Sequence, residues 1–151
     1  MLAKTHLAFG FLSGLMISPF VNTGNTPFFF ALILIGALIP DIDQKNSKIS
    51  NKTKPISRAM QLFTRHRGVF HSALAAILLS GLVWLFLSNT YGIALFIGYF
   101  SHLLIDSFTK SGINFLFPIA NLRISGFIKT GKTSEFLVLL VIIALIIIKI
   151  I

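Results

Sequence analysis

The amino-acid sequence predicts an all-α fold, a polytopic membrane helical bundle of about five helices that forms a single domain over residues 1–151. Of the 151 residues, 55% are apolar and only 11% are charged, whereas soluble domains carry about 25% charged residues. Residues 136–148 form an unbroken apolar run, of the kind that a bilayer protein needs. An ordinary water-soluble domain is therefore not the expected class.

Five apolar segments are the expected helices, because a backbone in hydrocarbon must satisfy its own N–H and C=O groups. The first follows a single Lys and lacks a small-x-small cleavage site, so we expect a retained helix and not a signal peptide. The second falls short of the roughly 20 residues that cross a bilayer, which implies local thinning or partial insertion. The segments are residues 7–21, 27–40, 70–87, 91–108 and 136–151.

The basic residues are divided unequally between the connections, and this predicts the orientation. Residues 41–69 contain seven Lys and Arg residues and residues 109–133 contain four, whereas residues 22–26 and 88–90 contain none. The positive-inside rule then places both basic connections on the cytoplasmic side of the cell membrane. Residues 57–64 suit a short helix on that leaflet.

The net charge of +9 first suggests nucleic acid as a partner, but the apolar runs argue against it. Membrane topology and attraction to anionic lipid account for most of the basic residues. We therefore expect membrane lipid as the solvent and as the substrate, with no nucleic acid bound.

Eight ionisable side chains are the candidate ligands for a metal ion. The chain has no cysteine, so imidazole and carboxylate groups must hold any metal. On the predicted topology all eight fall at the cytoplasmic ends of the helices, and ionisable residues beside a membrane span indicate a functional site. They are His6, Asp41, Asp43, His66, His71, His102, Asp106 and Glu135.

Most of these residues, taken singly, have a structural interpretation as well. His102 and Asp106 are four residues apart and share a helix face, where they either bind one cation or hydrogen-bond to each other. Asp41 and Asp43 are either ligands or residues of the turn that ends the second helix. Glu135 follows Thr133 and Ser134, so it is also explained as an acid at a helix N-terminus.

His71 is either a ligand or an interfacial histidine, and His66 lies in a basic stretch that solvent would also accommodate. The metal interpretation rests on the convergence of all these residues and on no single one of them.

Such a cluster suits a phosphoester hydrolase. Carboxylate oxygen and imidazole nitrogen favour zinc, with manganese or iron as alternatives. Two ions held close together activate water and stabilise the attacking and leaving oxygens of a phosphoester. Arg65, Arg67 and the lysines of the basic connections would supply positive charge to the phosphate, with Arg67 best placed between two histidines.

Several motifs resemble the LexA-regulated, inner-membrane-bound metal-dependent hydrolase family, and the likeness covers nearly the whole chain. They are H-R-G-V-F-H-S at residues 66–72, P-D-I-D at 40–43, G-Y-F-S-H-L-L-I-D at 98–106 and L-F-P at 116–118. That family is in turn similar in site pattern to the zinc-dependent phospholipase C and nuclease group of all-helical enzymes.

The resemblance implies roles for six of the candidate residues. Asp41, His71, His102 and Asp106 would form the main metal site, with Asp106 able to bridge, and His6 and Glu135 would serve neighbouring ions. We expect two or three ions in all, Asp43 or His66 as the base or as a group that orients a ligand, and Arg67 as the residue that binds phosphate.

Two other classes remain open from the sequence. The same ligands could serve a divalent-cation carrier or a metal sensor without chemistry, although transport sites usually lie nearer the midplane of the bilayer. A basic membrane scaffold for nucleic acid or protein would explain the charge but would make the ligand convergence accidental.

Overall fold

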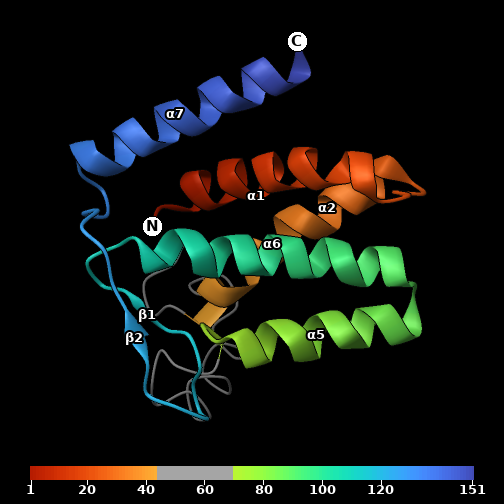
Figure 1. The fold of residues 1–151 in the computed structure, drawn as a ribbon, viewed down its shortest axis with the longest axis horizontal. Coiled ribbons are helices and arrows are strands. Elements are labelled where there is room, and N and C mark those ends of the chain that lie inside the picture. Colours follow the sequence, from red (N-terminus) through yellow and green to blue (C-terminus); the bar gives the residue numbers. More distant parts are fainter. Residues whose placement is uncertain (44–69) are drawn as a thin grey trace.

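The computed structural model describes residues 1–43 and 70–151, which contain five α-helices, two short 3₁₀ turns and one pair of strands (Figure 1). All five predicted segments are helical, which confirms the helical part of the prediction. The elements are α1 (Ala3–Ile17), η1 (Ser18–Phe20), α2 (Thr26–Gly36), η2 (Ile39–Asp43), α5 (Ala73–Phe86), α6 (Asn89–Ser107), β1 (Ile113–Asn114), β2 (Arg123–Ile124) and α7 (Thr133–Ile150).

The all-α prediction needs one correction, because β1 and β2 form a small antiparallel sheet. Ile113 pairs with Ile124, and Asn114 pairs with Arg123. Each strand has only two residues, too few to show the alternation by which a strand is recognised in a sequence. The connection between α6 and α7 is therefore a folded hairpin and not an irregular loop.

Local sequence explains where the helices begin and end. The side chains of Asn25, Ser72 and Ser88 accept hydrogen bonds from backbone N–H groups three residues further on, so each caps the start of a helix. α2 ends at Gly36, and Pro40, which lacks an N–H group to continue an α-helix, follows four residues later. The chain continues as the 3₁₀ turn η2, which carries Asp41.

Helix α6 lies at the centre of the bundle, between α5 on one side and α1 and α2 on the other (Figure 1). α2 and α6 approach closely through two glycines. A Cβ atom at Gly36 would lie 2.6 Å from the carbonyl oxygen of Leu95, and a Cβ atom at Gly98 would overlap the backbone of Ile33. This contact holds η2, at the end of α2, against α6.

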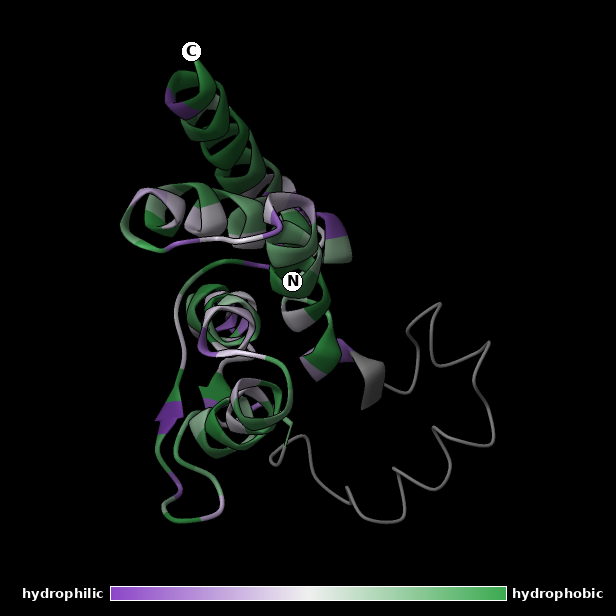
Figure 2. Cartoon of the chain, turned by 90° about the vertical axis from the view of Figure 1, so that its right-hand side faces the viewer, coloured by the Kyte–Doolittle hydropathy of each residue, from purple (hydrophilic) through white to green (hydrophobic). Residues whose placement is uncertain are grey.

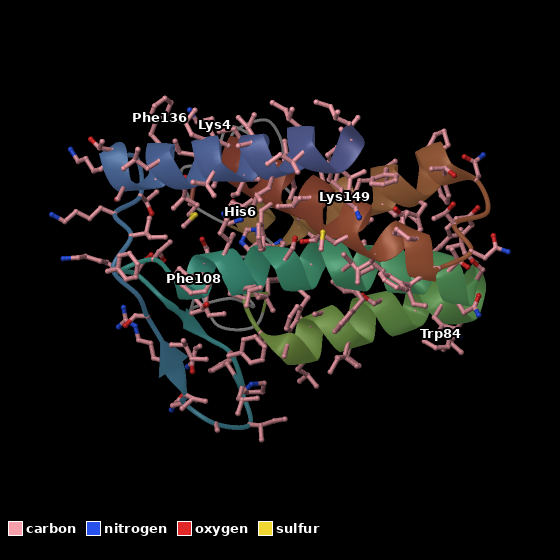
Figure 3. The ribbon with its side chains drawn as sticks, turned by 45° about the horizontal axis from the view of Figure 1, so that its top comes forward. Lys4, His6, Trp84, Phe108, Phe136 and Lys149 are labelled. Atoms are coloured by element: carbon pink, nitrogen blue, oxygen red, sulfur yellow. The ribbon has the colours of Figure 1, made fainter. Side chains whose placement is uncertain are left out.

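Many large apolar side chains are exposed on the outside of the bundle, and α7 consists of hydrophobic residues along most of its length (Figure 2). Within the described residues, α7 is the one helix long and apolar enough to cross a membrane, and 17% of its residues are buried. α2 and α5 are apolar but shorter. Trp84 and Phe136 point away from the bundle, whereas His6 points into it (Figure 3).

Candidate metal centre

Five of the predicted ligands meet at one end of the bundle. His6 lies near the start of α1, Asp41 lies in η2, His71 lies just before α5, and His102 and Asp106 lie near the end of α6. His6 and His102 are fully buried, His71 is 5% exposed and Asp106 is 7% exposed. Residues up to 100 positions apart in the chain are therefore gathered in one place that water reaches poorly.

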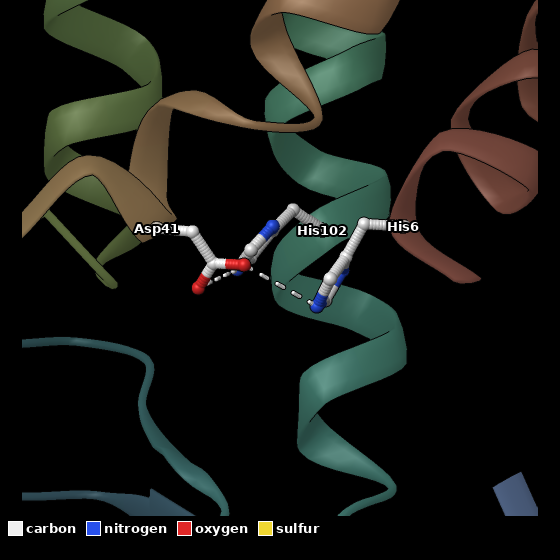
Figure 4. Close-up of side chains that lie close together, drawn as sticks. All are labelled: His6, Asp41 and His102. Atoms are coloured by element: carbon white, nitrogen blue, oxygen red, sulfur yellow. Dashed lines mark ion pairs between the residues drawn. The ribbon is translucent and has the colours of Figure 1, made fainter. Parts of the chain in front are cut away.

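Two overlapping groups within this cluster have the spacing of metal ligands. His6, Asp41 and His102 form one group (Figure 4), and His71, His102 and Asp106 form the other. Within each group the ligand atoms all lie within 4.8 Å of one another. His102 belongs to both groups and lies at the centre of the cluster, with its ring stacked on that of His6 at a centroid distance of 3.8 Å.

A backbone carbonyl sets the orientation of His102. Its Nδ1 lies 2.8 Å from the carbonyl oxygen of Ala37. Because a carbonyl oxygen can only accept, Nδ1 carries the proton and the lone pair of Nε2 faces the two carboxylates. Metal-binding histidines are commonly held by such a second hydrogen bond.

The two carboxylates are shared between the histidines on opposite sides of the cluster. Asp41 presents Oδ2 to Nε2 of His6 at 3.9 Å and Oδ1 to Nε2 of His102 at 3.8 Å. Asp106 presents Oδ1 to Nε2 of His6 at 3.4 Å and Oδ2 to Nε2 of His102 at 3.7 Å. His71 joins on one side, with Nε2 at 3.8 Å from Oδ1 of Asp41.

These distances fit two ligand atoms on one ion better than they fit hydrogen bonds. Hydrogen bonds between nitrogen and oxygen are about 2.7–3.2 Å long. Two ligand atoms that are each about 2.0–2.2 Å from the same ion lie roughly 3.3–3.6 Å apart at tetrahedral angles. Each carboxylate has one oxygen toward His6 and the other toward His102, which is the arrangement needed to bridge two ions.

Buried nitrogen atoms provide a second test of whether the cluster fits metal ions. Nδ1 and Nε2 of His6, Nδ1 of His71 and Nε2 of His102 are buried and have no hydrogen-bond partner among the described residues. A buried polar atom without a partner costs about 1–3 kcal/mol, so such atoms are rare without a functional reason. Divalent ions bound to Nε2 of His6 and Nε2 of His102, the atoms that face the carboxylates, would account for two of these four.

Charge in the cluster keeps Asp41 ionised. Burial raises the pKa of its carboxyl group. Contact with His71 and the fields of His102 and His6 lower this pKa by more than burial raises it, so the net pKa is below the ordinary value. The amino group of Met1 lies 2.6 Å from Oδ1 of Asp106. Both carboxylates therefore face positive or potentially positive groups, and both are in the form that binds metal.

Glu135 lies outside these groups and holds three other parts of the chain together. It is 2% exposed. Its Oε1 accepts hydrogen bonds from the backbone N–H of Leu2 at 2.6 Å and from the hydroxyl group of Thr5 at 2.8 Å. Its Oε2 accepts one from the N–H of Gly131 at 2.6 Å. Glu135 thus ties the start of α7 to the start of α1.

We expect Glu135→Gln to lower stability without removing metal. The amide can replace only one carboxylate oxygen as an acceptor, so a buried donor loses its partner at a cost of roughly 1–3 kcal/mol. The Tm of the purified protein should fall by several degrees, while its metal content stays unchanged. Thr133→Ala, an exposed change in the same turn, is the control. Loss of metal at an unchanged Tm would instead make Glu135 a ligand.

The remaining predicted site residues cannot be placed against the cluster. The backbone of Asp43 ends η2, but its side chain lies outside the described part of the structure, as do His66, Arg67 and the expected surface helix at residues 57–64. The sequence analysis missed Ala37, whose carbonyl oxygen orients His102. No side-chain pattern could have found it, because the interaction uses the backbone.

The fold and the cluster together define a class, namely a helical membrane protein with buried His and Asp groups that could hold metal ions. Within that class, the chain belongs to the YdjM inner membrane protein family, which it matches over residues 1–151.

The chain is similar to two kinds of curated relative, and those named YdjM agree with this family. The chain is 36% identical over 147 residues to the uncharacterized protein YvsG of Bacillus subtilis, covering 92% of this chain and 88% of YvsG. It is 29% identical over 129 residues to the inner membrane protein YdjM of Escherichia coli and of Shigella flexneri, covering 78% of this chain and 66% of each relative. No solved structure matches the chain.

Proposed function

We propose that this protein is a membrane-bound metal-dependent hydrolase that cleaves a phosphoester, of a membrane lipid or a lipid-linked phosphate, at the cytoplasmic face of the inner membrane. The observation that carries the proposal is the pair of carboxylates shared between His6 and His102. A cluster built only for stability would not leave buried imidazole nitrogens without partners.

The five clustered residues would be the ligands for the ions. His6, Asp41 and His102 would hold one ion and His71, His102 and Asp106 are the second candidate group. Zinc suits these ligands best, with manganese or iron as alternatives. Bound ions supply Lewis-acid chemistry, because they make water nucleophilic at neutral pH and offset the charge that develops on the phosphoester.

Groups of the protein itself would orient the ligands, accept a proton and bind the phosphate. The backbone carbonyl of Ala37 keeps Nδ1 of His102 protonated and its Nε2 directed at the site. Asp43 or His66 would accept the proton of the attacking water or orient a ligand, and Arg67 would bind the phosphate. Hydrolysis adds water across one P–O bond, so that an alcohol and a phosphate or phosphomonoester leave.

Placement in the membrane supports a lipid substrate. The helices expose many large apolar side chains, whereas the cluster lies at one end of the bundle, near the end of α6 and the start of α1. Bundle helices that cross the bilayer would bring this end close to the depth of the lipid headgroups. The phosphoester of a lipid would then reach the site while its acyl chains stay in the bilayer.

The test is hydrolysis by the protein in detergent or nanodiscs, loaded with zinc or manganese and given a panel of phospholipids and lipid phosphates. We expect released alcohol or phosphate with at least one substrate, and loss of release with a chelator. Asp106→Asn should lower the rate at least about 100-fold. Ser107→Ala, whose hydroxyl group donates only to Leu104 within the helix, should leave it unchanged.

The proposal is contradicted if the wild-type protein binds metal but hydrolyses no member of the panel. If sealed vesicles then show metal flux that Asp106→Asn abolishes, the same ligands serve transport and the hydrolase proposal is wrong.

A further inference from the structure

A cavity opens directly beside the metal centre. Its volume is about 980 Å³, and His71 and Asp106 of the cluster form part of its lining. Its other walls come from Met1 and from the segment between α6 and α7, and they include Lys110, Asn121, Arg123 and Lys129. Sites for small molecules have volumes of roughly 300–1,000 Å³, so the cavity can hold a ligand that also reaches the metal ligands.

The charge of the cavity favours an anion. Three of its lining side chains are cationic, Met1 adds the amino group that pairs with Asp106, and Asp106 is the one acid in the lining. Residues 107–132 contain no Asp or Glu, so the cations of this segment have no acidic partner within it. Divalent ions on Asp106 would make the cavity still more positive.

Hydrogen bonds fix this basic wall relative to the metal centre. The hydroxyl group of Thr109 donates to the carbonyl oxygen of Asp106 at 2.7 Å, and the N–H of Lys110 donates to the carbonyl oxygen of Ile128 at 3.0 Å. The guanidinium group of Arg123 donates to the carbonyl oxygen of Ser111 at 2.7 Å. The last contact positions Arg123 and leaves most of its five N–H donors free for a ligand.

Two glycines permit the fold of the wall. Gly112 has a φ of +60°, which residues with a side chain rarely adopt. A Cβ atom at Gly126 would overlap the carbonyl oxygen of Phe108. The wall therefore crosses the end of α6 at close backbone contact, and its cationic residues line the same cavity as Asp106.

Apolar side chains of the same segment are exposed to an unusual degree. Ile119 is 79% exposed, Phe127 is 77% exposed and Leu122 is 51% exposed. Large apolar side chains among Lys and Arg residues are typical of segments that lie in the membrane interface. They suit contact with acyl chains at the edge of the bilayer.

We infer that this cavity is a binding site for the phosphate-bearing headgroup of a lipid, with Lys110, Arg123 and Lys129 as its anion-binding residues. The inference rests on the proposed function for its biological meaning, since it names the class of substrate. The binding itself is a property of the cavity and can be measured without turnover.

The probe is octylphosphonate, because its P–C bond resists phosphoester hydrolysis while its headgroup carries the charge of a phosphate monoester. Methylphosphonate has the same headgroup and no chain, and so represents free phosphate. Binding of each is measured by isothermal titration to the zinc-loaded full chain in dodecyl maltoside, which contains no phosphate.

We expect octylphosphonate to bind at least about 10-fold more tightly than methylphosphonate, and the double variant Lys110→Ala/Lys129→Ala to weaken both at least about 10-fold. Both lysines are exposed, so the Tm should not change. The control is Lys132→Ala, which removes the same charge from an exposed position of this segment outside the cavity lining and should leave binding unchanged.

Three results would overturn the inference. The double variant could bind octylphosphonate as tightly as the wild type, Lys132→Ala could weaken binding as much as the double variant does, or both probes could bind equally, which would indicate free phosphate. These results differ from failure of the proposed function. If the protein binds octylphosphonate through the two lysines but hydrolyses no substrate, the headgroup site is supported and the hydrolase proposal is wrong.

Discussion

Replacement of His102 with alanine is expected to weaken zinc binding more than about 100-fold. His102 belongs to both groups of candidate ligands, so its loss removes a nitrogen from the middle of the cluster and leaves Asp41 and Asp106 without the imidazole between them. Loss of a residue that only orients a ligand typically costs 10–100-fold in metal affinity, and loss of a ligand should cost more.

The measurement is a competition titration against a chelating zinc indicator, with the protein in detergent. Ser107→Ala is the control, because it changes a side chain in the turn next to Asp106 without touching the cluster. The near-UV spectrum and Tm of the metal-free proteins show whether His102→Ala still folds. A folded His102→Ala protein with the zinc affinity of the wild type would show that the cluster is not the metal site.

Replacement of Gly98 with alanine is expected to have the largest effect on stability. A Cβ atom there would overlap the carbonyl oxygen, carbonyl carbon and Cα of Ile33. These are backbone atoms of α2, so no rotamer change can relieve the contact and the two helices must move apart. Overpacking of this kind costs at least about 2 kcal/mol, and the Tm should fall by at least about 5 °C.

The same change should also lower metal affinity. α2 leads into η2 with Asp41, and Ala37 at its end binds His102 on α6, so separation of the helices moves two ligands relative to each other. Gly81→Ala is the matched control, because a Cβ atom at Gly81 meets nothing within 4 Å. Alanine is also the better helix former, so this variant should be as stable as the wild type or more stable. Equal Tm values for both variants would contradict the close packing of α2 and α6.

Much of the helical architecture could be predicted from the sequence, because long apolar runs have few alternatives to helix in a membrane. The prediction of where each helix begins and ends was less accurate. α1 begins at Ala3 and not at residue 7, because Lys4, Thr5 and His6 are polar and do not extend an apolar run. The hairpin of β1 and β2 was missed, since its strands are held by contacts with the end of α6 and not by a periodic pattern.

The candidate site was predictable to the extent that it depends on residue type. His and Asp residues are scarce in this chain, so their positions at helix ends indicated one cluster, and the structure brings His6, Asp41, His71, His102 and Asp106 together. Glu135 has the same chemistry, but its distance from the cluster depends on how α7 packs, which residue type does not reveal. The cavity wall with Lys110, Arg123 and Lys129 depends on the fold of the hairpin, and composition showed only that the segment is basic.

The most direct test of the metal centre is the metal content per chain of the wild-type protein. The protein is purified in detergent without chelators or a metal-binding tag and analysed for zinc, manganese and iron, before and after incubation with zinc followed by removal of free metal. Two groups of candidate ligands predict two equivalents of divalent metal per chain. Less than a tenth of an equivalent, even after zinc is added, would contradict a metal centre in this protein.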